Sequence, residues 1–160
     1  MTSTTPAPNP EEGPSDYERV EGLRAYLLET LPPESYAYLD RGAHSGALTI
    51  GYLDKAAIQK TIADYTGTPC PVYYEEAHCS EAQNRAFWKA TEAWTLPVGA
   101  RLERVGPPAV QEGLFLAIHA TSEKQAQSVE KKLQALAKKQ EYPTESLTIT
   151  YLLPGENPNT

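Results

Sequence analysis

The chain has 160 residues and a mass of 17.6 kDa, and 40% of its residues are hydrophobic and 22% charged. This size predicts one globular domain or two small lobes. Its 14 Lys and Arg residues against 21 Asp and Glu residues give a formal net charge of -7, which disfavours nucleic acid as a partner. No apolar run approaches the roughly 18 residues of a membrane span, so no membrane contact is expected.

The first segment, residues 1–15, is a polar leader rich in proline. Too little of it is apolar to offset the entropy of ordering the chain, so we expect it to be flexible. It also lacks the apolar core of a secretory signal. With Met1 as the native start, the sequence predicts a cytoplasmic protein; if Met1 replaces a removed signal peptide, the protein is secreted.

Apolar residues then recur at the three- and four-residue spacing of a helix. Ser15 or Asp16 would cap this helix, and Pro32 with Pro33 would end it. A strand over 36–40 and a second over 48–53 follow, joined by a glycine-containing loop. The predicted apolar stripe of the helix consists of Tyr17, Val20, Leu23, Leu27, Leu28 and Leu31.

The same order of elements returns later in the chain. Asp54 caps a second helix, and a short strand over 72–77 closes the first series. Ser80 and Gln83 form a capping box that opens a helix running to about Thr95. A hairpin over 101–119, a helix capped by Thr121 or Ser122, and a strand over 147–151 complete the second series.

This repetition predicts an α+β fold of two similar halves, each with the order helix, strand, strand, helix, strand. The helices of each half are expected to cover one face of a small sheet. The predicted organisation is a leader over 1–15, a first half over 16–79, a second half over 80–156 and a flexible tail over 157–160. Residues 36–77 and 101–153 should be equivalent units.

A resemblance to a known family rests on this order and on several segments. These are the hairpin strand 45–51, the helix opened by Asp54, the strand near Val72, the helix capped by Ser80 and the ending at 154–156. Over roughly Val20 to Glu156 the chain resembles the pro-regions of α-lytic-protease and streptogrisin-type serine proteases. The resemblance implies an intramolecular chaperone and inhibitor that pairs its sheet with the protease and lays its C-terminal tail in the active site. The chain departs from this pattern because no protease domain follows residue 160, so we expect a free-standing relative with a different partner.

Cys70 and Cys79 flank the strand predicted over 72–77. In an extended chain these two residues would lie about 30 Å apart, whereas a disulfide requires less than about 7 Å between Cα atoms. Either the strand is wrongly predicted or both cysteines are free thiols, which would suit a reducing compartment.

Motifs for catalysis or metal binding are scarce. The sequence contains no P-loop, GxGxxG, HExxH or CxxC pattern. His44 and Ser45 lie in a predicted hairpin loop, not in a strand-to-helix turn, so we expect a solvated loop there. His78 and Cys79 lack a second pair of ligands. The sequence therefore predicts a non-enzyme without a metal or cofactor, and the lysines between 124 and 139 are interpreted as a solvated helix face.

Trp88 is the most informative single residue. On the helix that begins after Ser80, one face is predicted to carry Ala86, Phe87, Ala90, Ala93 and Trp94, which leaves Trp88 on the polar side. Exposed tryptophans are enriched at binding hot spots. The alternative is that Trp88 is covered where the two halves meet.

Two functions are compatible with these features. The first is a non-enzymatic protein-binding or inhibitor-like module that receives its partner at a sheet face or edge. Besides Trp88, its binding residues would be Tyr73, Phe115, His119, Thr148 and Thr150, which together with Thr49 alternate away from the predicted core. The alternative is a small-molecule-binding protein or enzyme that uses a tyrosine-rich cleft between the halves, with Tyr52, Tyr73, Tyr74, His78 and Cys79 nearby.

Overall fold

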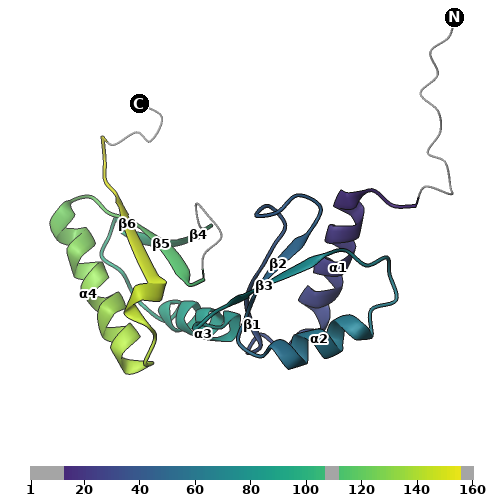
Figure 1. The fold of residues 1–160 in the computed structure, drawn as a ribbon. Helices are drawn as coiled ribbons and strands as arrows, with labels where there is room; N and C mark the ends of the chain where they lie inside the picture. Colours follow the sequence, from purple (N-terminus) through teal and green to yellow (C-terminus); the bar gives the residue numbers. More distant parts are fainter. Residues whose placement is uncertain (1–12, 107–111, 156–160) are drawn as a thin grey trace, which may run out of the picture.

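The computed structural model describes residues 13–106 and 112–155. The predicted tail and most of the predicted leader lie outside these residues. Within them the elements follow the predicted order (Figure 1). They are α1 (Asp16–Thr30), β1 (Tyr36–Asp40), β2 (Leu48–Tyr52), α2 (Lys55–Ala63), β3 (Val72–Glu76), α3 (Glu81–Thr91), β4 (Arg101–Val105), β5 (Leu114–His119), α4 (Glu123–Lys139), the short 3-10 helix η1 (Thr144–Ser146) and β6 (Leu147–Leu152).

The prediction of two similar halves is confirmed. The first sheet has the strand order β1-β2-β3 and the second has the order β4-β5-β6. In each sheet the first two strands are antiparallel and the last two are parallel. The parallel pair is connected through a helix, α2 in the first half and α4 in the second. The two halves therefore share both their order of elements and their strand pairing.

The helices begin where the sequence predicts, because local side chains satisfy their first amides. Ser15 accepts a hydrogen bond from the Glu18 amide, Asp54 from the Ala57 amide and Ser122 from the Gln125 amide. At α3, Ser80 and Gln83 form the predicted capping box. This helix ends at Thr91 and not near Thr95, and a turn in which the Trp94 amide donates to the Thr91 carbonyl follows it.

Each sheet packs its helices on one face and has its own apolar core. In Figure 1, α1 and α2 lie beside the first sheet and α4 beside the second, on sides that face away from each other. The first core is formed by Val20, Leu23, Leu27, Leu31, Tyr36, Leu39, Leu48, Ile50 and Ile58. The second is formed by Cys79, Phe87, Leu114, Leu116, Ile118, Ala120, Ala126, Val129, Leu133, Ala137 and Tyr142.

The apolar stripe of α1 is narrower than predicted. Tyr17 and Leu28 are 65% and 44% exposed. Both lie on one flank of the helix, away from the centre of the stripe that faces the sheet. The small first sheet therefore covers only part of the apolar surface that the residue spacing predicts for α1.

Helix α3 connects the halves. Its Phe87 side chain is fully buried in the second core. At its other side the Ala82 amide donates to the Pro33 carbonyl over 2.9 Å, and the Arg85 guanidinium donates to the Tyr36 hydroxyl over 3.5 Å. The contact between the halves in this region is thus made by the first turns of α3 and the entry to β1.

Of the two alternatives for the cysteines, the structure has the one with free thiols. The strand between the two cysteines is present as β3, and both Cys70 and Cys79 are free. Among the described residues, no helix is long and apolar enough to cross a membrane.

Candidate functional site

Four of the predicted binding residues share one surface of the second sheet. The register pairs Phe115 with Thr148 and His119 with Leu152, and paired residues in neighbouring strands point to the same side. This side is opposite the core residues Leu116 and Ile118 of β5. We call it the open face; it comprises Arg101, Glu103, Val105, Phe115, Ala117, His119, Thr148, Thr150 and Leu152.

The open face is accessible mainly at its rim. Thr148 and Thr150 on β6 are exposed and His119 is half-buried, as their predicted role requires. Phe115, however, is only 8% exposed. It lies on the central strand β5, between Val105 on one side and Thr148 on the other. Its place on this face is as predicted, but the expectation that its ring is available to a partner is wrong.

His119 is held by polar neighbours at one end of the open face. Its Nε2 lies 2.8 Å from a carboxylate oxygen of Glu103, and its Nδ1 lies 3.4 Å from the guanidinium of Arg101. Because a guanidinium can only donate, Nδ1 is the acceptor and Nε2–H donates to Glu103. This hydrogen bond from His119 lowers the pKa of the Glu103 carboxyl.

Tyr73 lies on the other sheet and is not brought together with these residues. It is 48% exposed on β3, and the ring of His44 stacks on it with centroids 4.0 Å apart. Thr49 is opposite Tyr73 in the register. Contrary to expectation, Thr49 is fully buried, and its hydroxyl has no hydrogen-bond partner among the described residues.

The neighbouring position on β2 is Gly51, which the ring of Tyr38 covers. A Cβ at Gly51 would come within 2.4 Å of that ring, so only glycine fits. The Tyr38 hydroxyl then reaches Glu75 on β3 over 3.0 Å. This face of the first sheet is therefore covered by its own aromatic side chains, in contrast to the open face.

The predicted placement of Trp88 on the polar side of α3 is wrong. The buried residues of α3 are Asn84, Phe87 and Thr91, and Trp88 is half-buried against the second core. The buried face is centred on a polar residue, Asn84, which a helical wheel assigns to solvent. Ala86 and Ala93, which the sequence spacing places on the apolar face, are exposed.

The tyrosine-rich cleft of the alternative function is not assembled. Tyr52 and Tyr74 contact each other edge-on at 6.2 Å, with Lys55 over both rings. They pack against the first core, whereas Tyr73 lies on the opposite face of β3 because strand neighbours alternate. Cys79 is buried in the second core.

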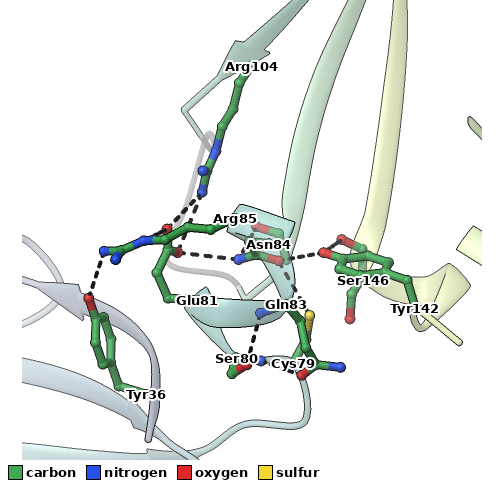
Figure 2. Close-up of polar contacts among 11 residues, drawn as sticks. Tyr36, Cys79, Ser80, Glu81, Gln83, Asn84, Arg85, Arg104, Tyr142 and Ser146 are labelled. Atoms are coloured by element: carbon green, nitrogen blue, oxygen red, sulfur yellow. Dashed lines mark hydrogen bonds and ion pairs between the residues drawn. The ribbon is translucent and has the colours of Figure 1, made fainter. Parts of the chain in front are cut away.

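Sequence reasoning missed a polar network around Asn84 (Figure 2). Its side-chain oxygen accepts hydrogen bonds from the Tyr142 hydroxyl at 2.6 Å and from the Cys79 thiol at 3.4 Å. Its amide nitrogen donates to the Gly113 carbonyl and to Glu81, each at 3.4 Å. Burial raises the pKa of the Cys79 thiol, so it remains protonated and is not poised as a nucleophile.

The pairs His78–Cys79 and His44–Ser45 show no arrangement for catalysis or metal binding among the described residues. The backbone amides of His78 and Cys79 both donate to the Glu112 carboxylate, at 2.5 and 2.8 Å. Ser45 is exposed in its loop, as predicted. In the part of the chain that the structure describes, no group of three or more His, Cys, Asp or Glu side chains is placed to hold a metal ion.

The sheet edges differ in how they are protected. Edge strands normally carry charges, bulges or covering side chains that prevent pairing with another chain. On β1 there is an irregular register between Tyr36 and Tyr38, and the Arg24 side chain donates to the Leu39 carbonyl over 3.0 Å. The other three edge strands are compared by their sequences: β3 is Val-Tyr-Tyr-Glu-Glu, β4 is Arg-Leu-Glu-Arg-Val and β6 is Leu-Thr-Ile-Thr-Tyr-Leu.

Strand β6 alone among these edges lacks a protecting feature in the described residues. It has no charged residue and no proline, and its register with β5 is uninterrupted. The β-branched Thr148, Ile149 and Thr150 favour an extended chain. Strand β6 also contributes Thr148 and Thr150, the exposed threonines of the open face. The candidate site is therefore the free edge of β6 together with these two threonines.

Comparisons with protein-family models, curated proteins and solved structures find no match for this chain. The resemblance to protease pro-regions therefore stays an expectation, and the function has to be argued from the site itself.

Proposed function

We propose that the protein is a non-enzymatic protein-binding module, inhibitor-like in its mode of binding, which receives an extended segment of its partner as a fourth strand at the edge of β6. The observation that supports this most is the unprotected edge of β6, beside three edges that carry charges or a covering side chain. Addition of a strand satisfies the unpaired main-chain groups of an edge and gives affinity through them.

The free main-chain groups of β6 follow from its pairing with β5. The Ala120 amide donates to the Leu152 carbonyl, which fixes Leu152, Thr150 and Thr148 as the residues whose main chain faces β5. The alternate residues, Ile149 and Tyr151, then direct their amides and carbonyls outward. These are the groups that a partner strand would pair with.

The side chains of a partner strand would extend both surfaces of the sheet. On one side they would lie next to Thr148 and Thr150, and on the other next to Ile149 and Tyr151, because cross-strand neighbours share a face. Both threonines are exposed. Ile149 and Tyr151 are half-buried against the second core, so a partner strand would bury their remaining apolar surface.

The proposal is tested by site-specific photocrosslinking. The photoreactive residue p-benzoylphenylalanine is placed at Thr150 and, as the matched control, at the exposed Thr66 in a loop of the first half. After irradiation in a native extract, the crosslinked partner segment is identified by mass spectrometry. We expect the probe at Thr150, but not the probe at Thr66, to mark one contiguous segment of a partner.

The captured partner is then measured against Thr148→Lys/Thr150→Lys, which gives β6 the kind of charge that protects natural edges. Thr66→Lys/Thr68→Lys is the control, since both of these threonines are also exposed. Binding should be lost only in the β6 variant. Equal affinities for the two variants, or crosslinks scattered over several segments, would contradict strand addition at β6.

A further inference from the structure

We propose that the segment added at β6 carries a lysine or arginine beside Tyr151, where the carboxylate of Glu130 on α4 would bind it. This inference rests on the proposed strand addition and names the chemistry of the partner. It follows from the contact between Glu130 of α4 and Tyr151 of β6.

Glu130 contacts a side chain of the edge strand β6. The Tyr151 hydroxyl donates a hydrogen bond to a Glu130 carboxylate oxygen. That bond, with burial and the negative charges of Glu130 and Glu123, raises the pKa of Tyr151 to about 12. The Glu130 carboxylate therefore lies within hydrogen-bond reach of the tip of Tyr151, beside which a side chain of an added strand would lie.

The negative charge of Glu130 is not neutralised within its own helix. The residues three and four positions away, where a helical ion pair would form, are Ala126, Gln127, Leu133 and Gln134. Glu123 has Ala126 and Gln127 at the corresponding positions and accepts a hydrogen bond from Gln127. Within the described residues neither carboxylate has an ion-pair partner.

Two lysines of α4, Lys124 and Lys131, line the same surface hollow as Glu130, but within the described residues neither forms an ion pair with it. At 100° per residue, Lys131 lies about 100° and Lys132 about 160° around from Glu130. Lys132 lies over the Trp94 ring at 5.1 Å. The carboxylate beside Tyr151 thus has no ion-pair partner among the described residues, and a basic side chain is the complement that it favours.

The same charges disfavour a second copy of this chain as the occupant. Two β6 strands related by a two-fold axis would be antiparallel, and each copy would bring its own Glu130 to the same interface. Like charges in close apposition oppose association, and each copy has a net charge of -7. We therefore assign the edge to a basic segment of a different protein.

The probe is a synthetic heptapeptide of the sequence Thr-Lys-Thr-Val-Thr-Lys-Thr with blocked ends. Alternate residues share a face, so in the register that places its valine beside Ile149 its lysines lie on the side of Tyr151 in either chain direction. Two matched peptides replace both lysines with glutamine or with glutamate. Binding is followed by titrating the isotope-labelled protein and recording the NMR shifts of the Ile149 and Tyr151 amides.

We expect the lysine peptide to shift these amides and to bind about fivefold or more tightly than the glutamate peptide at low salt, with the glutamine peptide between them. Added salt should reduce the difference. In Glu130→Gln, which keeps an acceptor for the Tyr151 hydroxyl, the preference for lysine should shrink. In the control Glu29→Gln, at an exposed position of α1, it should be unchanged.

The outcomes separate this inference from the function on which it rests. If the three peptides bind β6 with equal affinity, the charge assignment is wrong and strand addition stands. If the lysine preference survives in Glu130→Gln, Glu130 does not provide it. If no peptide shifts the Ile149 and Tyr151 amides, strand addition itself fails. If these amides shift with protein concentration alone, the occupant is a second copy.

Discussion

At the scale of single residues, polar groups that sequence patterns assign to solvent are buried or paired in the structure. Asn84 is almost completely buried and accepts hydrogen bonds from Tyr142 and Cys79. Tyr142 is distant from it in sequence, and Cys79 precedes its helix. Thr49 is buried without a partner for its hydroxyl. A buried donor or acceptor is costly unless it is paired, so these two residues should behave in opposite ways when mutated.

Thr49→Val should stabilise the protein. Valine has nearly the same shape as threonine, favours a strand and removes a buried hydroxyl that makes no hydrogen bond. We expect the free energy of unfolding to rise by about 1 kcal/mol, measured by urea denaturation. The control Thr148→Val, at an exposed position, should change it by less than about 0.5 kcal/mol. A loss of stability in Thr49→Val would mean that its hydroxyl is paired.

The Glu103–His119 hydrogen bond predicts a pH dependence. The pKa of Glu103 is lower in the folded state than its ordinary value of about 4.3, because the carboxylate accepts a bond from His119. Its contribution to stability is therefore complete above that ordinary value and is lost as the pH falls through the lower, folded pKa. Carbon-13 NMR titration should show the pKa of Glu103 rising in His119→Leu. An identical pKa in both proteins would contradict this interaction.

At the scale of elements, the sequence predicts most of what the structure contains. Caps such as Ser80 with Gln83 act within a few residues, so their helices begin where the pattern places them. Element order then indicates the duplication. Sequence spacing could not predict the orientation of α3, because it depends on contacts of Asn84 with residues up to 58 positions away. It also could not show that Glu130 lies against Tyr151, which is 21 positions away.

Trp88→Ala tests the orientation of α3. Trp88 is half-buried against the second core, so its loss should lower the free energy of unfolding by about 2 kcal/mol, between a surface change and a fully buried aromatic. The control is Lys89→Ala, at the exposed next position, which should change it by less than about 0.5 kcal/mol. If thermal melting finds both variants equally stable, Trp88 faces solvent, and it is again a candidate binding residue.

At the scale of the whole molecule, two copies of one topology have acquired different surfaces. In the first sheet, Tyr38 and Tyr73 cover the face away from the helices, and the edge strand β3 ends in two glutamates. In the second sheet, the equivalent edge strand β6 is uncharged and contains two exposed threonines, Thr148 and Thr150. The duplicated fold thus supplies a stable framework, and binding is proposed for only one of its two equivalent edges.

The accessibility of β6 is measured most directly by amide hydrogen exchange, resolved by residue. In the free protein, the Ile149 and Tyr151 amides should exchange faster than those of Thr148 and Thr150, which face β5. In complex with the captured partner, or with the lysine heptapeptide at saturation, the Ile149 and Tyr151 amides should become protected. Protection of these two amides already in the free monomer, or unchanged exchange in the complex, would contradict an open edge that receives a strand.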